Sequence, residues 1–102
     1  MIRLRLTREA RNDLRDIRLY SIRDFGRDVA NAFLRRLAKT VRQLQEQPRL
    51  SEPAIDISAN ARIFRHRTHR IVNRLTDHEV TITMVVHQAR DLAVLMERLR
   101  LQ

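Results

Sequence analysis

The residue types best suited to chemistry lie in a basic segment from Ala61 to Leu75, which contains no acid. Histidine can accept and donate a proton near neutral pH, and arginine can hold a phosphate through two hydrogen bonds. The segment therefore carries the groups of a site that binds or cleaves an anionic chain. Its basic residues are Arg62, Arg65, His66, Arg67, His69, Arg70 and Arg74.

A second histidine-containing stretch, VVHQARDLAVLM, follows near the end of the chain. His87 stands where a strand-like run ends, and Arg90 follows it closely. Together with the basic segment, this stretch offers the groups of a metal-free ribonuclease: a base for the 2′-hydroxyl, an acid for the leaving oxygen and cations over the phosphate. The residues of such a site would be Arg65, His69, Arg74, His87 and Arg90.

The same residues also fit a surface that binds without catalysis, with histidines at strand ends and arginines on solvated strand faces. No metal site is expected, because His66 and His69 flank a turn without a nearby carboxylate and the chain has no cysteine. An aromatic platform for RNA is not expected either, since Phe25, Phe33 and Phe64 fit core positions. We expect no cofactor.

The composition describes one small basic domain, residues 1–102, with enough hydrophobic residues for a modest core. Lysine and arginine number 21 against 12 acids, so the net charge is +9 and an anionic partner is expected, either nucleic acid or an acidic protein segment. The chain has no cysteine, no apolar run long enough to span a membrane and no signal peptide. These features predict a cytoplasmic protein without a membrane partner.

Two helices joined by a glycine are predicted in the first half of the chain. Apolar and arginine residues alternate over residues 2–6 as in a short strand, and Thr7 stands where a helix N-cap belongs. Apolar residues then repeat at helical spacing as far as Phe25, and again from about Arg27 to Gln47. Gly26 is placed as a residue that ends a helix with positive φ, so a short antiparallel helical hairpin is predicted.

Three strands are predicted after a proline-containing loop from Gln47 to Ala59. The strand-like runs are Ala61–His66, His69–Leu75 and Glu79–His87, and the short turns between them predict antiparallel pairing. A last amphipathic run predicts a C-terminal helix with Asp91 as its N-cap and with Leu92, Leu95, Met96 and Leu99 on one face. The predicted fold is α+β, in the order β-α-α-β-β-β-α, with the helical hairpin on one face of a small, mainly antiparallel sheet.

Strand alternation predicts which of these residues share a face of the sheet. In the first run, Arg62 and His66 lie with Phe64, whereas Arg65 lies with Ala61 and Ile63. In the second run, one face carries Arg70, Val72 and Arg74, and the other carries His69, Ile71, Asn73 and Leu75. In the third run, one face of an inner strand is expected to carry Val80, Ile82, Met84 and Val86.

Four strings occur in an order and spacing that are similar to a known family. The first string, LTREARNDLRDIRLYSIRDFG, contains a strand end, Leu-Thr, an Ala-x-x-Asp-Leu helix and an aromatic-Gly ending. The second, HRIVNRL, occupies the place of a Tyr-x-Ile-x-Tyr-Arg-Val strand, and the third, VVHQARDL, contains a hydrophobic strand followed by His-x-Ala-Arg-Asp. The fourth, DLAVLMERLRL, looks like an extra C-terminal helix. The chain thereby resembles the ParE branch of the RelE/ParE toxin superfamily, the plasmid stabilisation family. The resemblance leaves out the loop from Gln47 to Ala59, and His69 and Asn73 replace the family's usual tyrosines.

The resemblance implies a toxin that binds DNA gyrase and inhibits it, rather than an enzyme, because ParE-type members are regarded as lacking the nuclease constellation. It also implies a cognate antitoxin whose acidic, flexible C-terminal segment folds onto the toxin in a hetero-oligomer. Two alternatives remain open. One is a RelE-like messenger-RNA interferase that uses the ribonuclease residues named above, and the other is a non-toxic nucleic-acid-binding relative.

Partner binding is expected from exposed apolar residues and from the basic strand faces. Leu19 lies opposite the apolar stripe of its helix, and the C-terminal apolar residues could instead pack the last helix onto its own sheet. The candidate partner-binding residues are Leu19, Ile22, Arg62, Arg65, Arg70, Arg74, Arg90, Leu92, Leu95, Met96 and Leu99.

Overall fold

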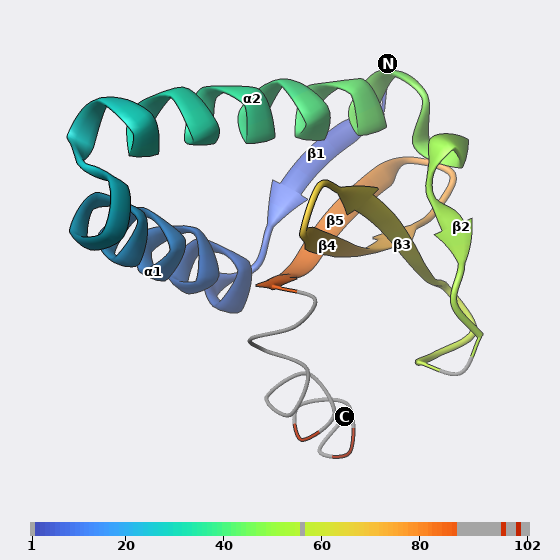
Figure 1. The fold of residues 1–102 in the computed structure, drawn as a ribbon. Helices are drawn as coiled ribbons and strands as arrows, with labels where there is room; N and C mark the ends of the chain where they lie inside the picture. The colour runs from blue at the N-terminus through green and yellow to red at the C-terminus, as the bar shows by residue number, and fades with distance from the viewer. Residues whose placement is uncertain (1, 56, 88–96, 98–99, 101–102) are drawn as a thin grey trace.

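The computed structural model describes residues 2–55, 57–87, 97 and 100. Two helices cover one face of a sheet, as Figure 1 shows. The predicted α+β class is confirmed, while the predicted helix from Leu92 to Leu99 lies outside the described residues. The elements are β1 (Arg3–Leu6), α1 (Arg8–Phe25), α2 (Arg27–Glu46), the short 3-10 helix η1 (Pro48–Leu50), β2 (Glu52–Pro53), β3 (Ala61–His66), β4 (His69–Leu75) and β5 (Glu79–His87).

Local signals set the ends of the two helices. The Thr7 hydroxyl accepts a hydrogen bond from the backbone N–H of Ala10 at 3.1 Å, so it caps the first turn of α1 as predicted. Gly26 has a φ of 89° and a ψ of 165°, and its N–H donates to the carbonyl of Ile22. This backbone conformation is open to glycine and strained for other residues, so α2 can begin directly after α1 ends.

The sheet contains five strands in the order β1-β5-β4-β3-β2. Sequential strands from β2 to β5 pair antiparallel, whereas β1 pairs parallel to β5 after the chain has passed through the helical hairpin. The bounds predicted for the three long strands are confirmed. The proline-containing loop was only partly predicted, because it includes η1 and the edge strand β2.

The sheet carries apolar clusters on both faces. Between the sheet and the helices, the buried residues are Ala10, Ile17, Leu37, Val41, Leu44, Ile71, Ile82 and Val85. On the outer face, which is the face turned away from the helices, the buried residues are Val72, Met84 and Val86, and Ile57 and Ile63 pack against them. The predicted alternation in β3 and β4 is therefore confirmed, since Phe64 and Ile71 contact the helix-side core and Ile63 and Val72 do not.

A β-bulge in β5 overturns the prediction that Ile82, Met84 and Val86 share one face. Asn73 pairs with Ile82 and Val72 pairs with Met84, so Thr83 is an extra residue in the strand. The insertion reverses the alternation, which leaves Ile82 in the helix-side core and Met84 and Val86 in the outer cluster. The alternation of apolar and polar residues in the sequence cannot reveal such an insertion, because the insertion depends on pairing with β4.

The core position predicted for Phe25 is also wrong. The Phe25 side chain is 66% exposed, although Ile17 and Ser21 on the same stripe are buried. Figure 1 shows why, because the joint between α1 and α2 projects beyond the sheet and has no strand beneath it. The apolar stripe of α1 extends past the end of the sheet, so Phe25 has no part of the sheet to pack against.

Candidate anion-binding face and histidine cluster

The two faces of the sheet separate the candidate residues. Arg65 and Arg70 are cross-strand partners in β3 and β4 and lie on the outer face with Ile63 and Val72. His69 lies on the helix side of β4 and is only 4% exposed. The sheet therefore stands between the His69 ring and the Arg65 guanidinium, and the fold does not bring these two groups of the predicted ribonuclease site together.

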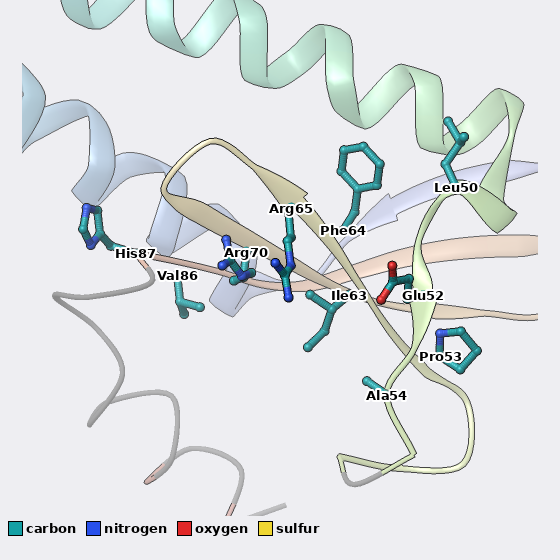
Figure 2. Close-up of a pocket in the computed structure, with 10 residues that line it drawn as sticks. All are labelled: Leu50, Glu52, Pro53, Ala54, Ile63, Phe64, Arg65, Arg70, Val86 and His87. Atoms are coloured by element: carbon teal, nitrogen blue, oxygen red, sulfur yellow. The ribbon is translucent and has the colours of Figure 1, made fainter.

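A hollow of about 450 Å³ lies against the outer face and extends around the edge of β3, where β2 ends and Phe64 also lines it. We call it the outer hollow, and Figure 2 shows that its side chains come from the segment around β2 and from β3, β4 and β5, the last of which contributes His87. Its apolar lining includes Leu50, Ile63 and Val86, and its cations are Arg65 and Arg70. Glu52 is the acid in the lining.

The two outer arginines are placed to receive an anion. Like charges directly opposite each other on neighbouring strands destabilise a sheet, so an anion bound between Arg65 and Arg70 would remove a repulsion. Arg70 donates a hydrogen bond from Nη1 to the carbonyl of His69 at 3.3 Å, which leaves donors of its guanidinium for a ligand. Arg65 is exposed. The chemistry that fits is a carboxylate or phosphate held by two guanidinium groups.

Arg62, predicted as a partner-binding residue, has an internal role. Its side chain lies on the helix side of β3, where Nε donates to the hydroxyl of Ser51 at 2.9 Å and Nη2 donates to the Ser51 carbonyl. Ser51 is buried, and its hydroxyl donates in turn to the carbonyl of Pro48 at 2.9 Å. Arg62 thus holds the chain between η1 and β2 against the sheet.

His69 belongs to a cluster of rings between the helices and the ends of β3, β4 and β5. Its Nε2 lies 3.0 Å from the hydroxyl of Tyr20 on α1. The ring of Phe33 on α2 is 5.2 Å from the His69 ring, and the ring of His87 is also 5.2 Å away, edge to face at 86°. These contacts tie both helices to the sheet, so His69 is held as a packing residue.

His66, at the end of β3, completes this histidine cluster. The Thr40 hydroxyl donates to the carbonyl of Arg36 at 3.2 Å, so it accepts from Nδ1 of His66 at 2.9 Å. Burial lowers the pKa of His66 below its ordinary value, and the charges of Arg67 and Arg36 lower it further. These contacts fit a neutral ring with its proton on Nδ1, and Nε2 is a buried atom without a hydrogen-bond partner among the described residues.

Apolar side chains are exposed where the two helices meet. Phe25 and Val29 are 66% and 52% exposed, and both line a pocket of about 310 Å³ that reaches Tyr20 and His69. Leu19, which was predicted to be exposed, is 58% exposed on α1. We call this region the hairpin tip, and its apolar exposure suits contact with another protein.

The remaining predicted residues are distributed as follows. Ile22 is partly buried on α1, and Arg74 is exposed on the outer face. Arg90, Leu92, Leu95, Met96 and Leu99 lie outside the described residues. Among the residues that the structure describes, no group of three or more histidines, cysteines or acids could hold a metal, and no helix is long and apolar enough to cross a membrane.

Sequence reasoning missed the roles of Tyr20, Thr40 and Val29. Tyr20 and Thr40 each have one long-range partner, which lies 49 and 26 residues away in the chain, and no local pattern announces such a pair. Val29 could have been suspected, because it lies only three positions after Gly26, where α2 begins beyond the sheet.

Comparisons with known proteins agree with this fold. Residues 4–92 match the family model of the ParE toxin of the type II toxin–antitoxin system parDE. Toxin ParE1 of Caulobacter vibrioides is 32% identical over 85 residues, which cover 83% of this chain and 88% of that protein.

Two solved structures have a similar fold. One is the chromosomal ParDE toxin–antitoxin system of P. aeruginosa, with a TM-score of 0.76, 20% identity and coverage of 85% of this chain and 96% of that chain. The other is the toxin–antitoxin complex RelBE2 of Mycobacterium tuberculosis, with a TM-score of 0.62, 23% identity and coverage of 84% and 96%.

Proposed function

Since the chain belongs to the ParE toxin family of type II toxin–antitoxin systems, we propose that it inhibits DNA gyrase by protein binding and that a cognate antitoxin neutralises it. The family match over residues 4–92 is the observation that carries this proposal. A gyrase target and an antitoxin partner would both be met in the cytoplasm, so the proposal includes a cytoplasmic location.

The charge of the chain supports an antitoxin with an acidic, flexible C-terminal segment. A net charge of +9 accelerates capture of an acidic chain, and Arg65 and Arg70 supply a local receptor for its carboxylates. A flexible segment can fold onto the toxin as it binds and so cover a large surface. The assembly would be a toxin–antitoxin hetero-oligomer.

The hairpin tip supports a protein target. Phe25, Val29 and Leu19 expose apolar area that the chain's own core does not cover. Burial of such area is the main favourable contribution when proteins associate. We assign these residues, with Ile22 beside them, to contact with gyrase.

The mRNA interferase alternative is less well supported. A metal-free cleavage site needs its proton carriers and its phosphate-binding cations around one scissile bond. His87 lines the outer hollow together with Arg65 and Arg70, but His69, the second proton carrier of that site, is buried against Tyr20 on the helix side. A single phosphodiester could not contact both His69 and Arg65 without unfolding of the sheet.

Two assays on the purified chain test the proposal. Gyrase supercoiling and gyrase-dependent DNA breaks are measured in one, and primer extension on messenger RNA in the other. We expect lost supercoiling with intact transcripts. Cut transcripts with normal supercoiling would overturn the proposal in favour of the interferase, and no effect in either assay would favour a non-toxic relative.

His87→Ala provides a matched test of catalysis within the same assays. His87 packs edge to face on His69 at the end of β5, and the proposed function gives it no proton-transfer role. We expect the variant to inhibit gyrase as the parent chain does, provided that circular dichroism shows it folded. Loss of activity in the folded variant would instead indicate chemistry or target contact at this position.

A further inference from the structure

One side of α1 carries a row of exposed arginines. They follow one another at spacings of three, four and three residues, which places them on one side of a helix with about 3.6 residues per turn. The row lies about a third of a turn around the helix from the buried residues Ala10, Ile17 and Ser21, so it faces solvent. We call it the α1 arginine row, and its members are Arg8, Arg11, Arg15 and Arg18.

The acids that alternate with these arginines in the sequence lie on other sides of the helix. Glu9 and Asp16 are about 120–140° around the helix from the middle of the row. Asp13 is turned toward the sheet, where its Oδ2 accepts the backbone N–H of Val85 at 2.9 Å. Within the part of the chain that the structure describes, no member of the row makes an ion pair. The row is therefore a strip of positive charge without acids.

This arrangement is unfavourable for the helix by itself. Like charges three or four positions apart repel each other, and each arginine of the row has such a neighbour. Arg8 and Arg11 also lie near the N-terminal end of α1, where the helix dipole disfavours a cation. A bound polyanion would offset both effects, so the row suits a ligand with several regularly spaced negative charges.

We propose that the α1 arginine row binds the phosphate backbone of duplex DNA without reading its sequence. From Arg8 to Arg18 the helix rises about 15 Å, which corresponds to four or five base pairs at about 3.4 Å each. The planar guanidinium holds a phosphate through two hydrogen bonds, and such contacts give affinity and orientation without base readout. This contact is separate from the proposed gyrase and antitoxin contacts and depends on neither.

The composition of the row favours duplex DNA over other polyanions. No aromatic residue lies between Arg8 and Arg18, so the row offers no base stacking of the kind that commonly binds single-stranded RNA. An acidic protein segment would need apolar contacts at the centre of its interface. The large apolar residues of this stretch, Leu14 and Ile17, pack instead into the helix-side core. This side of α1 therefore exposes positive charge and little else.

A second set of cations, on α2, provides a matched comparison. Arg35, Lys39 and Arg42 are exposed on one side of that helix. Asp28 and Glu46 are exposed on the same side toward its two ends, so acids flank these cations. Removal of three cations from either helix lowers the net charge by the same amount. A difference in DNA binding between the two would therefore reflect where the charges lie.

Fluorescence anisotropy of a short labelled duplex measures binding by the full chain. A triple variant combines Arg11→Gln, Arg15→Gln and Arg18→Gln. We expect it to bind at least about tenfold more weakly at about 0.1 M salt. The slope of log K against log salt concentration should become about 2–3 less negative, because each lost phosphate contact removes about 0.9.

Two further variants separate position from charge. The control combines Arg35→Gln, Lys39→Gln and Arg42→Gln, and we expect it to weaken binding less than about threefold. Replacement of the same three α1 arginines by lysine keeps the charge, so the salt slope should stay as in the parent chain and the affinity within about threefold. Circular dichroism establishes that each variant is folded.

Each contrary result has a definite meaning. Equal weakening by the α1 and α2 glutamine variants would overturn the site, because net charge alone would then account for binding. A difference of more than about tenfold between two duplexes of unrelated sequence would overturn a contact to the backbone alone. Absence of duplex binding at about 0.1 M salt would also overturn the proposal. If poly-glutamate then bound to the parent chain and not to the α1 variant, the row would belong to an acidic protein.

Discussion

At the scale of single residues, the structure separates side chains of one type into different roles. Arg62 and Arg65 lie three positions apart in one strand, yet Arg62 is bound to Ser51 whereas Arg65 is exposed beside the outer hollow. His66 and His69 likewise have different partners, Thr40 and Tyr20. Residue type alone could not distinguish these roles, because the distinction depends on partners that are remote in sequence.

The Tyr20 hydroxyl is expected to contribute to stability through its contact with buried His69. Tyr20→Phe removes one hydrogen-bonding partner without changing the ring, so we expect a loss of about 1–2 kcal/mol in the free energy of unfolding. Urea denaturation followed by circular dichroism measures it. Leu19→Ala, at the exposed neighbouring position, is the control and should change stability by less than about 0.5 kcal/mol. Equal effects would contradict the assignment.

His66 should make stability depend on pH in the mildly acidic range. Its pKa is lowered in the folded chain by burial and by Arg67 and Arg36, so the unfolded chain binds more protons. The free energy of unfolding should therefore fall as the pH drops below about 6.5, the unfolded histidine value, and level off below the folded pKa. Above the pKa of the unfolded histidine, His66 is neutral in both the folded and the unfolded chain, so this loss of stability is absent.

Melting temperatures of His66→Gln and His78→Gln across this pH range test the assignment. His78 is exposed in the turn between β4 and β5 and serves as the matched control. We expect a shallower decline toward low pH in His66→Gln than in the parent chain, and an unaltered slope in His78→Gln. A parallel decline in all three proteins would show that other groups produce the pH dependence.

At the scale of elements, local signals in sequence predicted most of what was observed. The helix N-cap at Thr7, the joint at Gly26 and the bounds of β3, β4 and β5 follow from capping chemistry and periodicity. The bulge at Thr83 and the edge strand β2 did not, because each exists only through pairing with another strand. The exposure of Phe25 was missed for the same reason, since periodicity does not reveal where the sheet ends.

Gly26 should be irreplaceable at the joint between the helices. Its φ of 89° is combined with a ψ of 165°, which lies outside the left-handed helical region that asparagine tolerates. A side-chain carbon added there would meet no heavy atom within 4 Å, so the cost is backbone strain and not a clash. We expect Gly26→Ala and Gly26→Asn each to lower the free energy of unfolding by about 1–3 kcal/mol in urea denaturation. Rescue by asparagine would contradict this conformation.

Arg62 should matter for the segment before β2, and Arg65 should not. Arg62→Ala leaves buried Ser51 without its guanidinium partner, so we expect a loss of about 1–3 kcal/mol and faster amide exchange around Ser51. The exposed Arg65→Ala is the matched control from the same strand, with an expected change below about 0.5 kcal/mol. Urea denaturation and amide exchange distinguish the two variants.

At the scale of the whole molecule, charge and fold act together. A net charge of +9 attracts any anion, and the sheet gives that attraction a direction by placing Arg65 and Arg70 on the outer face while the helices cover the other. Phe25 and Val29 form a separate apolar region at the hairpin tip. Two different partner surfaces on one small domain suit a toxin that has both a target and an antitoxin.

Salt should affect these two surfaces unequally. Association with an acidic peptide should weaken strongly between about 0.05 and about 0.5 M salt, because exposed charges are screened over shorter distances as ionic strength rises. Gyrase inhibition through the apolar tip should lose less, and Phe25→Ser should reduce it at both salt concentrations. Calorimetry and supercoiling assays measure the two dependences. Equal salt sensitivity of both would contradict the separation of surfaces.

Local periodicity and composition were enough to predict the α+β class, the two helices, the three long strands and the excess of positive charge, and four sequence strings carried the family resemblance. The folded arrangement was needed to learn which face of the sheet each basic residue occupies, which arginine is bound internally and where β2 stops pairing with β3. Those properties depend on contacts between segments far apart in the chain. The packing of His87 against His69 is one such contact, and the string VVHQARDLAVLM does not predict it.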